Sequence, residues 1–373
     1  DGHPVLAFDR RPGGALTMRR WLVPLLLLGL VAFLACNAST FEPQSKVDTV
    51  RIFATRADAP YVKPGDRVTL EVLLGDGRQD KSRPLRHFWI PVVCLNPQDD
   101  LYYACFIPTD GGNGAGAVDG GARLIPTFDA GVGDAGAGGG NGSVIGSLPQ
   151  GVDLSPFLPQ GPTFSFTMPA DAIIPRQGID PYGIAIVFDI ACAGHITLVA
   201  RDPNGGPQQV PLQCAGDDGL PLPPSQYVIG ISRVYAYDMR TNANPIVDDF
   251  MKDGVHVDAT QGIVVDKCTE AKSANCPDIK LDVHVPDASW ELNPSETEHD
   301  GTAFHEQIWV DYYSDVGDFT DDTRLLFDAQ RGRVDDTAAK YHAPKDVSDG
   351  TVWAVVHDNR GGASWMTLPI HVK

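Results

Sequence analysis

The chain has 373 residues, of which 48 are aspartate or glutamate and 29 are lysine or arginine, so its formal net charge is −19. A hydrophobic fraction of 43% is enough to build cores, which excludes a globally disordered chain. The acidic excess repels phosphate backbones, and because the sequence contains no basic patch to offset it, nucleic acid is excluded as a partner.

An apolar segment preceded by two arginines stands near the N-terminus. It reads MRRWLVPLLLLGLVAFLAC, with an uncharged, mostly apolar run from Trp21 to Ala35. At 15 residues, interrupted by a proline and a glycine, this run is short for a membrane-spanning helix and typical of a signal peptide. We therefore expect residues 1–35 to be an N-terminal extension and a cleaved signal peptide.

The end of this run, Phe33-Leu34-Ala35-Cys36, resembles the lipobox of bacterial lipoproteins, in which the cysteine receives lipid on its sulfur and becomes the new N-terminus. The resemblance implies that Cys36 is lipidated, that residues 36–46 form a tether, and that the membrane is a partner through this lipid. Asn37 is not the aspartate that signals inner-membrane retention in enteric lipoproteins, which favours the outer membrane, facing the periplasm or the cell surface. The alternative is an ordinary secretory signal that happens to contain a cysteine.

The other six cysteines fall into three pairs of near neighbours: Cys94 with Cys105, Cys192 with Cys214, and Cys268 with Cys276. Six cysteines allow 15 connectivities, so nearest-neighbour pairing is one choice among many. An even number in an exported chain is what disulfides require. No two cysteines have the C-x-x-C spacing that brings adjacent thiolates to one zinc ion, which argues against a cysteine metal site.

Alternating apolar residues predict β-strands in the first half of the chain. Val50, Ile52 and Ala54 alternate with Arg51, Phe53 and Thr55, and the alternation resumes after a turn at residues 63–66. The run Tyr182 to Ile190 is more continuously apolar, as expected for a strand buried on both faces. We expect residues 47–220 to form a first β domain.

A glycine-rich segment, residues 110–147, interrupts this domain. Glycine makes up 14 of its 38 residues, so it has too little apolar surface to offset the entropy of ordering, and we expect a mobile insertion. Residues 131–136 match G-x-G-x-x-G. Because neither a strand before them nor a helix after them is predicted, the match does not indicate dinucleotide binding.

A second β domain, residues 226–373, is expected after a proline-rich linker at residues 221–225. Residues 279–285 alternate between apolar and polar side chains, and the chain ends in a hairpin whose turn is residues 359–362. This ending resembles PKD-like, cadherin-like and other Ig-like modules of bacterial surface proteins, a family of unassigned function. The resemblance implies an all-β fold of two Ig-like antiparallel β-sandwich domains and implies no activity.

A cluster of metal-ligand side chains is the strongest candidate for chemistry. The sequence His305-Glu306-Gln307-Ile308-Trp309 begins like a zincin helix, but tryptophan stands where the second histidine is needed. The surrounding donors are Glu296, Glu298, His299, Asp300, His305 and Glu306. These residues allow a metal-dependent hydrolase on a β scaffold as an alternative function, whereas the simpler interpretation is a solvated acidic loop.

Two acidic runs are candidates for calcium, which prefers several hard oxygen ligands. They consist of Asp315, Asp318, Asp321 and Asp322 and, separately, of Asp248, Asp249 and Asp253. We favour a role in solubility over a calcium site.

Aromatic residues are the candidates for binding. Tyr102 and Tyr103 lie between the first two cysteines, where a short disulfide would present them rigidly to a glycan or a protein of the envelope, although they can equally be core residues. Trp353 and Trp365 are expected to pack across the final hairpin. Without a catalytic motif, the sequence predicts a lipid-anchored envelope protein with a structural, adhesion or binding role that is not an enzyme and needs no cofactor, calcium excepted.

Overall fold

The computed structural model describes residues 43–106, 123–126, 151–199, 210–271, 275–297, 301 and 303–373. These residues form mainly antiparallel sheets, with β2 (Tyr61–Val62) on β12 (Tyr227–Ala236) and β15 (Ile263–Val265) on β25 (Ala363–Val372) paired in parallel, and contain no helix of seven or more residues, which confirms the all-β prediction. Among them there is no helix with the length and hydropathy that crossing a bilayer requires. Residues 44–373 make up one compact unit. Cys36 and most of the glycine-rich segment lie outside the described residues.

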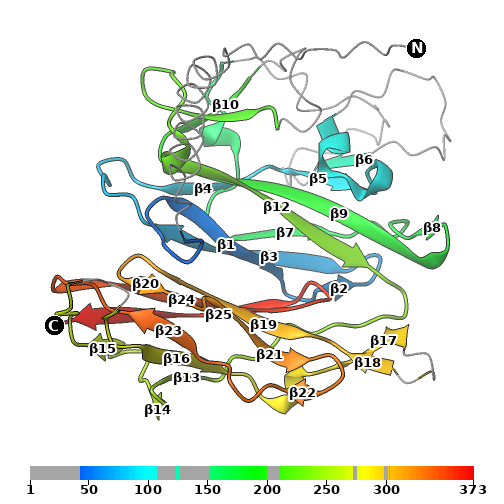
Figure 1. The fold of residues 1–373 in the computed structure, drawn as a ribbon. Coiled ribbons are helices and arrows are strands. Elements are labelled where there is room, and N and C mark those ends of the chain that lie inside the picture. Colours follow the sequence, from blue (N-terminus) through cyan, green and yellow to red (C-terminus); the bar gives the residue numbers. More distant parts are fainter. Residues whose placement is uncertain are drawn as a thin grey trace, which may run out of the picture. The chain divides into compact units, whose positions relative to one another are not determined.

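Two groups of sheets follow each other along the chain (Figure 1). The first group contains a three-stranded sheet in the order β1 (Val50–Ala57), β3 (Arg67–Asp76), β7 (Thr163–Thr167). Its larger sheet has the order β2 (Tyr61–Val62), β12 (Tyr227–Ala236), β9 (Ile179–Cys192), β5 (Val92–Leu95), β6 (Arg123–Pro126), with β4 (Arg86–Trp89) and β8 (Ile174–Arg176) also paired to β9. A separate hairpin joins β10 (His195–Leu198) to β11 (Leu212–Ala215).

The second group, like the first, consists of two larger sheets and a separate two-stranded hairpin. One sheet has the order β14 (Val255–His256), β13 (Asp249–Lys252), β16 (Ile279–His284), β23 (Ala339–His342), β20 (Asp318–Phe319). The other has the order β15 (Ile263–Val265), β25 (Ala363–Val372), β24 (Ser348–Asp358), β19 (Ile308–Ser314), β21 (Thr323–Asp328), β22 (Gly332–Arg333). A small hairpin pairs β17 (Leu292–Thr297) with β18 (Ala303–His305).

Strand β9 is buried on both faces, as its continuous apolar run predicted. Ala185 and Val187 belong to one core, whereas Ile184, Ile186 and the following even-numbered residues belong to a second core on the opposite face. Successive side chains of a strand point to opposite faces, so a strand that lies between two cores needs apolar residues at every position. The disulfide cysteines Cys94, Cys105, Cys192 and Cys214 are part of the second core.

Strand β1 differs from the prediction at Phe53. The register of β1 against β3 shifts between Ile52 and Ala54, and both Phe53 and Ala54 are buried. Phe53 packs against Tyr313 and Trp353, with ring centroids 4.6 and 4.9 Å apart. The strict alternation predicted for this strand is therefore broken at Phe53, which residues of the second group cover.

The final hairpin forms as predicted, with β24 and β25 paired from Ser348↔Val372 to His357↔Ala363. The two tryptophans are not direct partners, because Trp353 pairs with Thr367 and Trp365 with Val355. Both side chains pack into the core cluster that contains Phe53.

Strand β12 pairs with β9 over ten residues and therefore belongs to the sheets of the first group. The change from one group of sheets to the other falls between β12 and β13, after the expected linker at residues 221–225. Division of the chain into two Ig-like domains stays a prediction.

Candidate functional site

Two neighbouring residues of the expected metal site, His305 and Glu306, face different partners. The imidazole of His305 stacks on the ring of Trp290, with 3.7 Å between centroids and 15° between planes. Glu306, the next residue, is fully buried. His299 lies outside the described residues. Within the described ranges, no three histidine, cysteine or acidic side chains gather into a group that would hold a metal ion.

The Glu306 carboxylate is bound by Arg360, which stands in the turn between β24 and β25. Nε and Nη2 of Arg360 donate to Oε2 of Glu306 at 2.9 and 2.6 Å. Nη2 also donates to Oε2 of Glu291 at 2.6 Å, and Nη1 donates to the backbone oxygen of Thr241 at 3.2 Å. One guanidinium thus connects the hairpin turn to the residue after β18 and to the segment after β12.

A third carboxylate, that of Asp358, completes this cluster. Its Oδ1 accepts hydrogen bonds from the backbone nitrogens of Arg360 and Gly362 at 2.7 and 2.8 Å. The side-chain nitrogen of Asn242 donates to Oδ2 at 3.2 Å. Asn242, Asp358 and Arg360 are each less than 9% exposed. We call Asn242, Glu291, Glu306, Asp358 and Arg360 the Arg360 cluster.

Burial controls the protonation of this cluster. It raises the pKa of Glu306 from 4.5 to about 7; the nearby Asp358 charge adds to the rise and Arg360 opposes it. Burial also raises the pKa of Asp358, against hydrogen bonds from Gly362 and Arg360. A carboxylate held by a guanidinium and shielded from water is not available as a metal ligand or a general base, so the geometry indicates a structural role.

The aspartates of the first acidic run make separate contacts in different parts of the structure. Asp315 Oδ1 accepts the backbone N–H of Thr351 at 2.6 Å. A carboxylate oxygen of Asp321 lies 3.5 Å from Nζ of Lys340, and Asp318 is exposed at the start of β20. These three aspartates therefore serve separate local structures, and calcium binding by them stays a prediction.

The second acidic run is engaged with histidines and backbone. Asp248 Oδ1 lies 2.6 Å from Nδ1 of His284, and Asp249 Oδ1 lies 2.5 Å from Nδ1 of His256. Asp253 Oδ1 accepts a backbone N–H on the neighbouring strand at 3.0 Å. The run thus lies along β13 and at its two ends.

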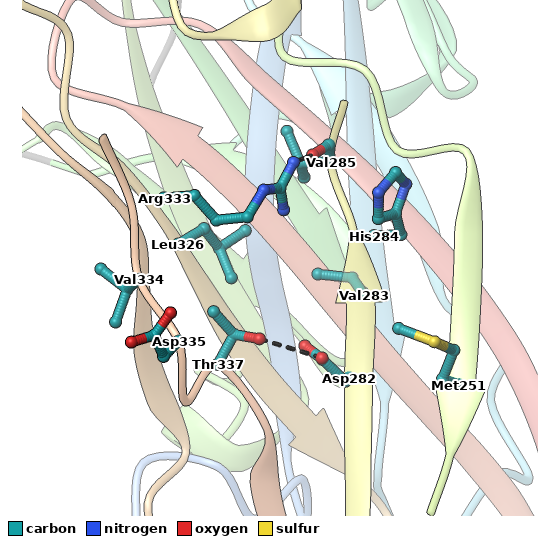
Figure 2. Close-up of a pocket in the computed structure, with 10 residues that line it drawn as sticks. All are labelled: Met251, Asp282, Val283, His284, Val285, Leu326, Arg333, Val334, Asp335 and Thr337. Carbon is teal, nitrogen blue, oxygen red and sulfur yellow. Dashed lines mark hydrogen bonds between the residues drawn. The ribbon is translucent and has the colours of Figure 1, made fainter. Parts of the chain in front are cut away.

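A pocket of about 230 Å³ opens beside β16 (Figure 2). It forms because β16 pairs with β23 only as far as Leu281↔Ala339, after which the strands separate. Side chains bridge the gap: Thr337 Oγ1 donates to Asp282 Oδ2 at 2.9 Å, and Arg333 Nη2 donates to the backbone oxygen of Val285 at 2.7 Å.

Asp282 is the distinctive group of this pocket. Its Oδ1 is buried without a hydrogen-bond partner among the described residues, and burial raises its pKa, opposed by hydrogen bonds from Thr337 and the Val283 backbone. Arg333 is already paired with Asp287 at 2.6 Å. The pocket therefore offers one acceptor to a small solute, and the Thr337 hydroxyl that lines it already donates to Asp282.

The two tyrosines expected to bind a partner lie in a 3-10 turn, η2 (Tyr102–Phe106), inside the Cys94–Cys105 disulfide loop. Tyr102 and Tyr103 are half-buried and meet edge to face, with ring centroids 5.7 Å apart. Tyr102 also packs in part against the core that contains both cysteines. Tyr102 thus contributes in part to the core, and a binding role for either ring stays a prediction.

Four further tyrosines form a cluster that we call the tyrosine surface: Tyr61, Tyr182, Tyr235 and Tyr237. Tyr235 is the direct cross-strand partner of Tyr61, and the same ladder places Tyr182 beside Tyr237. Neighbouring ring centroids are 4.7 to 6.4 Å apart, and each residue is half-buried.

Two arginines cover ring faces at this surface. The guanidinium of Arg176 lies 4.3 Å from the ring centroid of Tyr182, and that of Arg240 lies 5.0 Å from the ring centroid of Tyr237. Asp100 pairs with Arg176 at 3.0 Å and also accepts a hydrogen bond from the Tyr182 hydroxyl. Because Asp100 is two residues before Tyr102, it connects the sequence-predicted pair to this cluster.

The hydroxyls of the tyrosine surface stay protonated at neutral pH. Burial raises the pKa of Tyr61 and of Tyr182 to about 12, and it also raises the pKa of Tyr235 and of Tyr237. Neutral phenols are hydrogen-bond donors and acceptors with a large apolar body, which suits binding rather than nucleophilic chemistry.

A groove of about 420 Å³ adjoins the tyrosine surface at Tyr61 and Arg240. Its lining consists of Asp58, Ala59, Tyr61, Val62, Lys63, Asp66, Arg67, Arg240 and Thr241. Sequence reasoning missed both features because the tyrosines come from three distant strands. The one available signal was Tyr235 and Tyr237, two apart at the end of a strand and so on one face.

No protein-family model and no curated protein matches the chain. The solved structures that are similar to the chain include two at 11% sequence identity. One is the dimeric latent PorU of Porphyromonas gingivalis, with 88% of this chain and 24% of that chain covered and a TM-score of 0.19. The other is the native conformation of the E. coli alpha-2-macroglobulin, with 88% and 17% covered and a TM-score of 0.20. The chain spans about a quarter or less of these proteins, and at such TM-scores neither similarity bears on its function.

Proposed function

We propose that the protein is a lipid-anchored component of the bacterial cell envelope that binds a partner through its sheet surface and does not catalyse a reaction. The observation that carries the proposal is the cysteine pairing. Three disulfides join Cys94 to Cys105, Cys192 to Cys214 and Cys268 to Cys276. Of the seven cysteines in the chain, this leaves Cys36, at the end of the lipobox-like sequence.

The pairing supports an exported protein because disulfides persist in oxidising compartments and are rare in the cytosol. All six paired cysteines are buried, so the bonds belong to the cores and not to an exposed redox centre. A lipid anchor on the remaining cysteine agrees with the signal-peptide pattern before it.

The tyrosine surface supports a binding role, because half-exposed tyrosines and arginines are enriched where proteins meet partners. The hydrolase alternative receives no such support, since Glu306 is bound by Arg360 and His305 by Trp290. We therefore do not propose a metal-dependent activity.

The test is metabolic labelling with a clickable fatty acid in a Gram-negative host that expresses the whole chain. We expect label on the wild type, its loss in Cys36→Ser, its retention in the neighbouring variant Asn37→Ser, and recovery of the labelled protein with the outer membrane on a density gradient. An unlabelled wild-type protein recovered free of membranes would contradict the proposal.

A further inference from the structure

We propose that the tyrosine surface and its groove are the docking site for a segment of another protein that presents a carboxylate beside an apolar side chain. The inference rests on the binding role proposed above and names the surface and the chemistry of the partner.

The composition of the surface fits a protein interface. Tyrosine, methionine and arginine are enriched in such interfaces, whereas glutamate and lysine are depleted. Met239, between Tyr237 and Arg240 in the chain, is 92% exposed, the most exposed of the large hydrophobic side chains in the described part of the chain. A flexible thioether in solvent beside half-buried rings provides apolar area that adapts to a partner.

Among the described residues, the ion pairs at the tyrosine surface leave one arginine free to bind a carboxylate of the partner. Asp100 pairs with Arg176, and Asp180 pairs with Arg240 at 2.5 Å. Arg233, exposed on β12 and two residues before Tyr235, has no ion pair within the described ranges.

The lining of the groove contains three cations, Lys63, Arg67 and Arg240, and two aspartates. Lys63 and Arg67 are exposed and likewise form no ion pair with any residue that the structure describes. The two aspartates of the groove are instead engaged with backbone, since Asp58 Oδ1 accepts the N–H of Thr69 at 3.0 Å and Asp66 Oδ2 accepts that of Lys63 at 3.2 Å. In a chain of net charge −19, a place where cations lack partners attracts an acidic segment.

The ring geometry favours a protein over a glycan. A sugar that stacks on an aromatic ring needs an open, flat ring face, but Arg176 and Arg240 lie over the faces of Tyr182 and Tyr237. The rings also meet one another at tilted angles, for example 52° between Tyr61 and Tyr237. Ring edges, hydroxyls and guanidinium groups are what this surface presents, and these suit polar and apolar side chains of a protein.

The experiment selects phage-displayed random 12-residue peptides on the detergent-solubilised full chain with its disulfides intact. We expect the selected peptides to be enriched in aspartate or glutamate next to an aromatic or aliphatic residue. For a synthetic peptide from the selection, fluorescence anisotropy should show an affinity reduced about tenfold or more by Arg233→Glu and by Tyr235→Ala. Arg331→Glu, the same charge reversal in the second group of sheets, is the matched control and should retain the affinity.

The inference would be overturned by selected peptides without acidic enrichment, by an affinity that Arg233→Glu leaves unchanged, or by binding of polygalacturonate in place of peptides. A dimer in light scattering that Arg233→Glu dissociates would also overturn it, by making a second copy the occupant. Arg233→Glu changes only an exposed side chain, so it tests the site even where Tyr235→Ala disturbs the fold. Fatty-acid labelling does not depend on these variants, so failure of the docking site and failure of the lipid anchor are distinguishable.

Discussion

Replacing Glu306 by glutamine tests whether a buried acid sets part of the pH dependence of stability. Its pKa in the folded protein, about 7, lies above the 4.5 of an unfolded chain. Between these values the native state binds more protons than the unfolded state, so the contribution of Glu306 to stability is greatest in acid and is lost as the pH rises through 7.

The magnitude follows from the two pKa values. Between pH 5 and pH 8 the wild type should lose about 2.5 kcal/mol of unfolding free energy through Glu306 alone. Glu306→Gln has no proton to exchange at this position. The unfolding free energy of the wild type minus that of the variant should therefore be larger at pH 5 than at pH 8 by that amount. Both proteins carry the same other acids, which cancel in the comparison.

Urea unfolding followed by tryptophan fluorescence at pH 5 and pH 8 measures this difference. Glu291→Gln is the control, because it removes a carboxylate that binds the same Arg360 nitrogen at 2.6 Å but is 34% exposed and therefore screened by water. For Glu291→Gln, the stability difference from the wild type should change much less between pH 5 and pH 8. A change below about 0.5 kcal/mol for Glu306→Gln, or one of opposite sign, would refute the reasoning, since Arg360 would then keep Glu306 ionised throughout.

Two other changes test the packing. Replacing both Cys192 and Cys214 by alanine opens a loop of sequence separation 22 and should cost about 3 kcal/mol of unfolding free energy, measured by urea titration; a loss below about 1 kcal/mol would mean that the disulfide is dispensable to the fold. Tyr312→Phe leaves the buried N–H of Val283 without the hydroxyl that accepts it at 3.0 Å, so we expect a loss of about 1–3 kcal/mol in the same assay, and an unchanged midpoint would contradict the role of this hydrogen bond.

The parts of the fold that the sequence predicted are those that depend on local patterns. The two-sided burial of β9 and the final hairpin follow from residues within one or two strands. The burial of Phe53 could not be predicted locally because the side chains that cover it, Tyr313 and Trp353, come from strands more than 250 residues later. The group to which β12 belongs likewise depends on its pairing with β9, which no local alternation specifies.

The same limit applies to the candidate metal ligands His305 and Glu306. His305 and Glu306 are neighbours in the sequence, but on an extended chain consecutive side chains point to opposite sides, and one meets Trp290 while the other meets Arg360. A count of metal-ligand residues in a segment does not reveal this, because the nearest cation for Glu306 comes from 54 residues away. In a chain with many more acids than bases, each buried carboxylate needs a partner of this kind. The informative positions are therefore the bases without an acid. Arg233 forms no ion pair with any residue that the structure describes, and it lies beside the tyrosines that the sequence alone did not bring together.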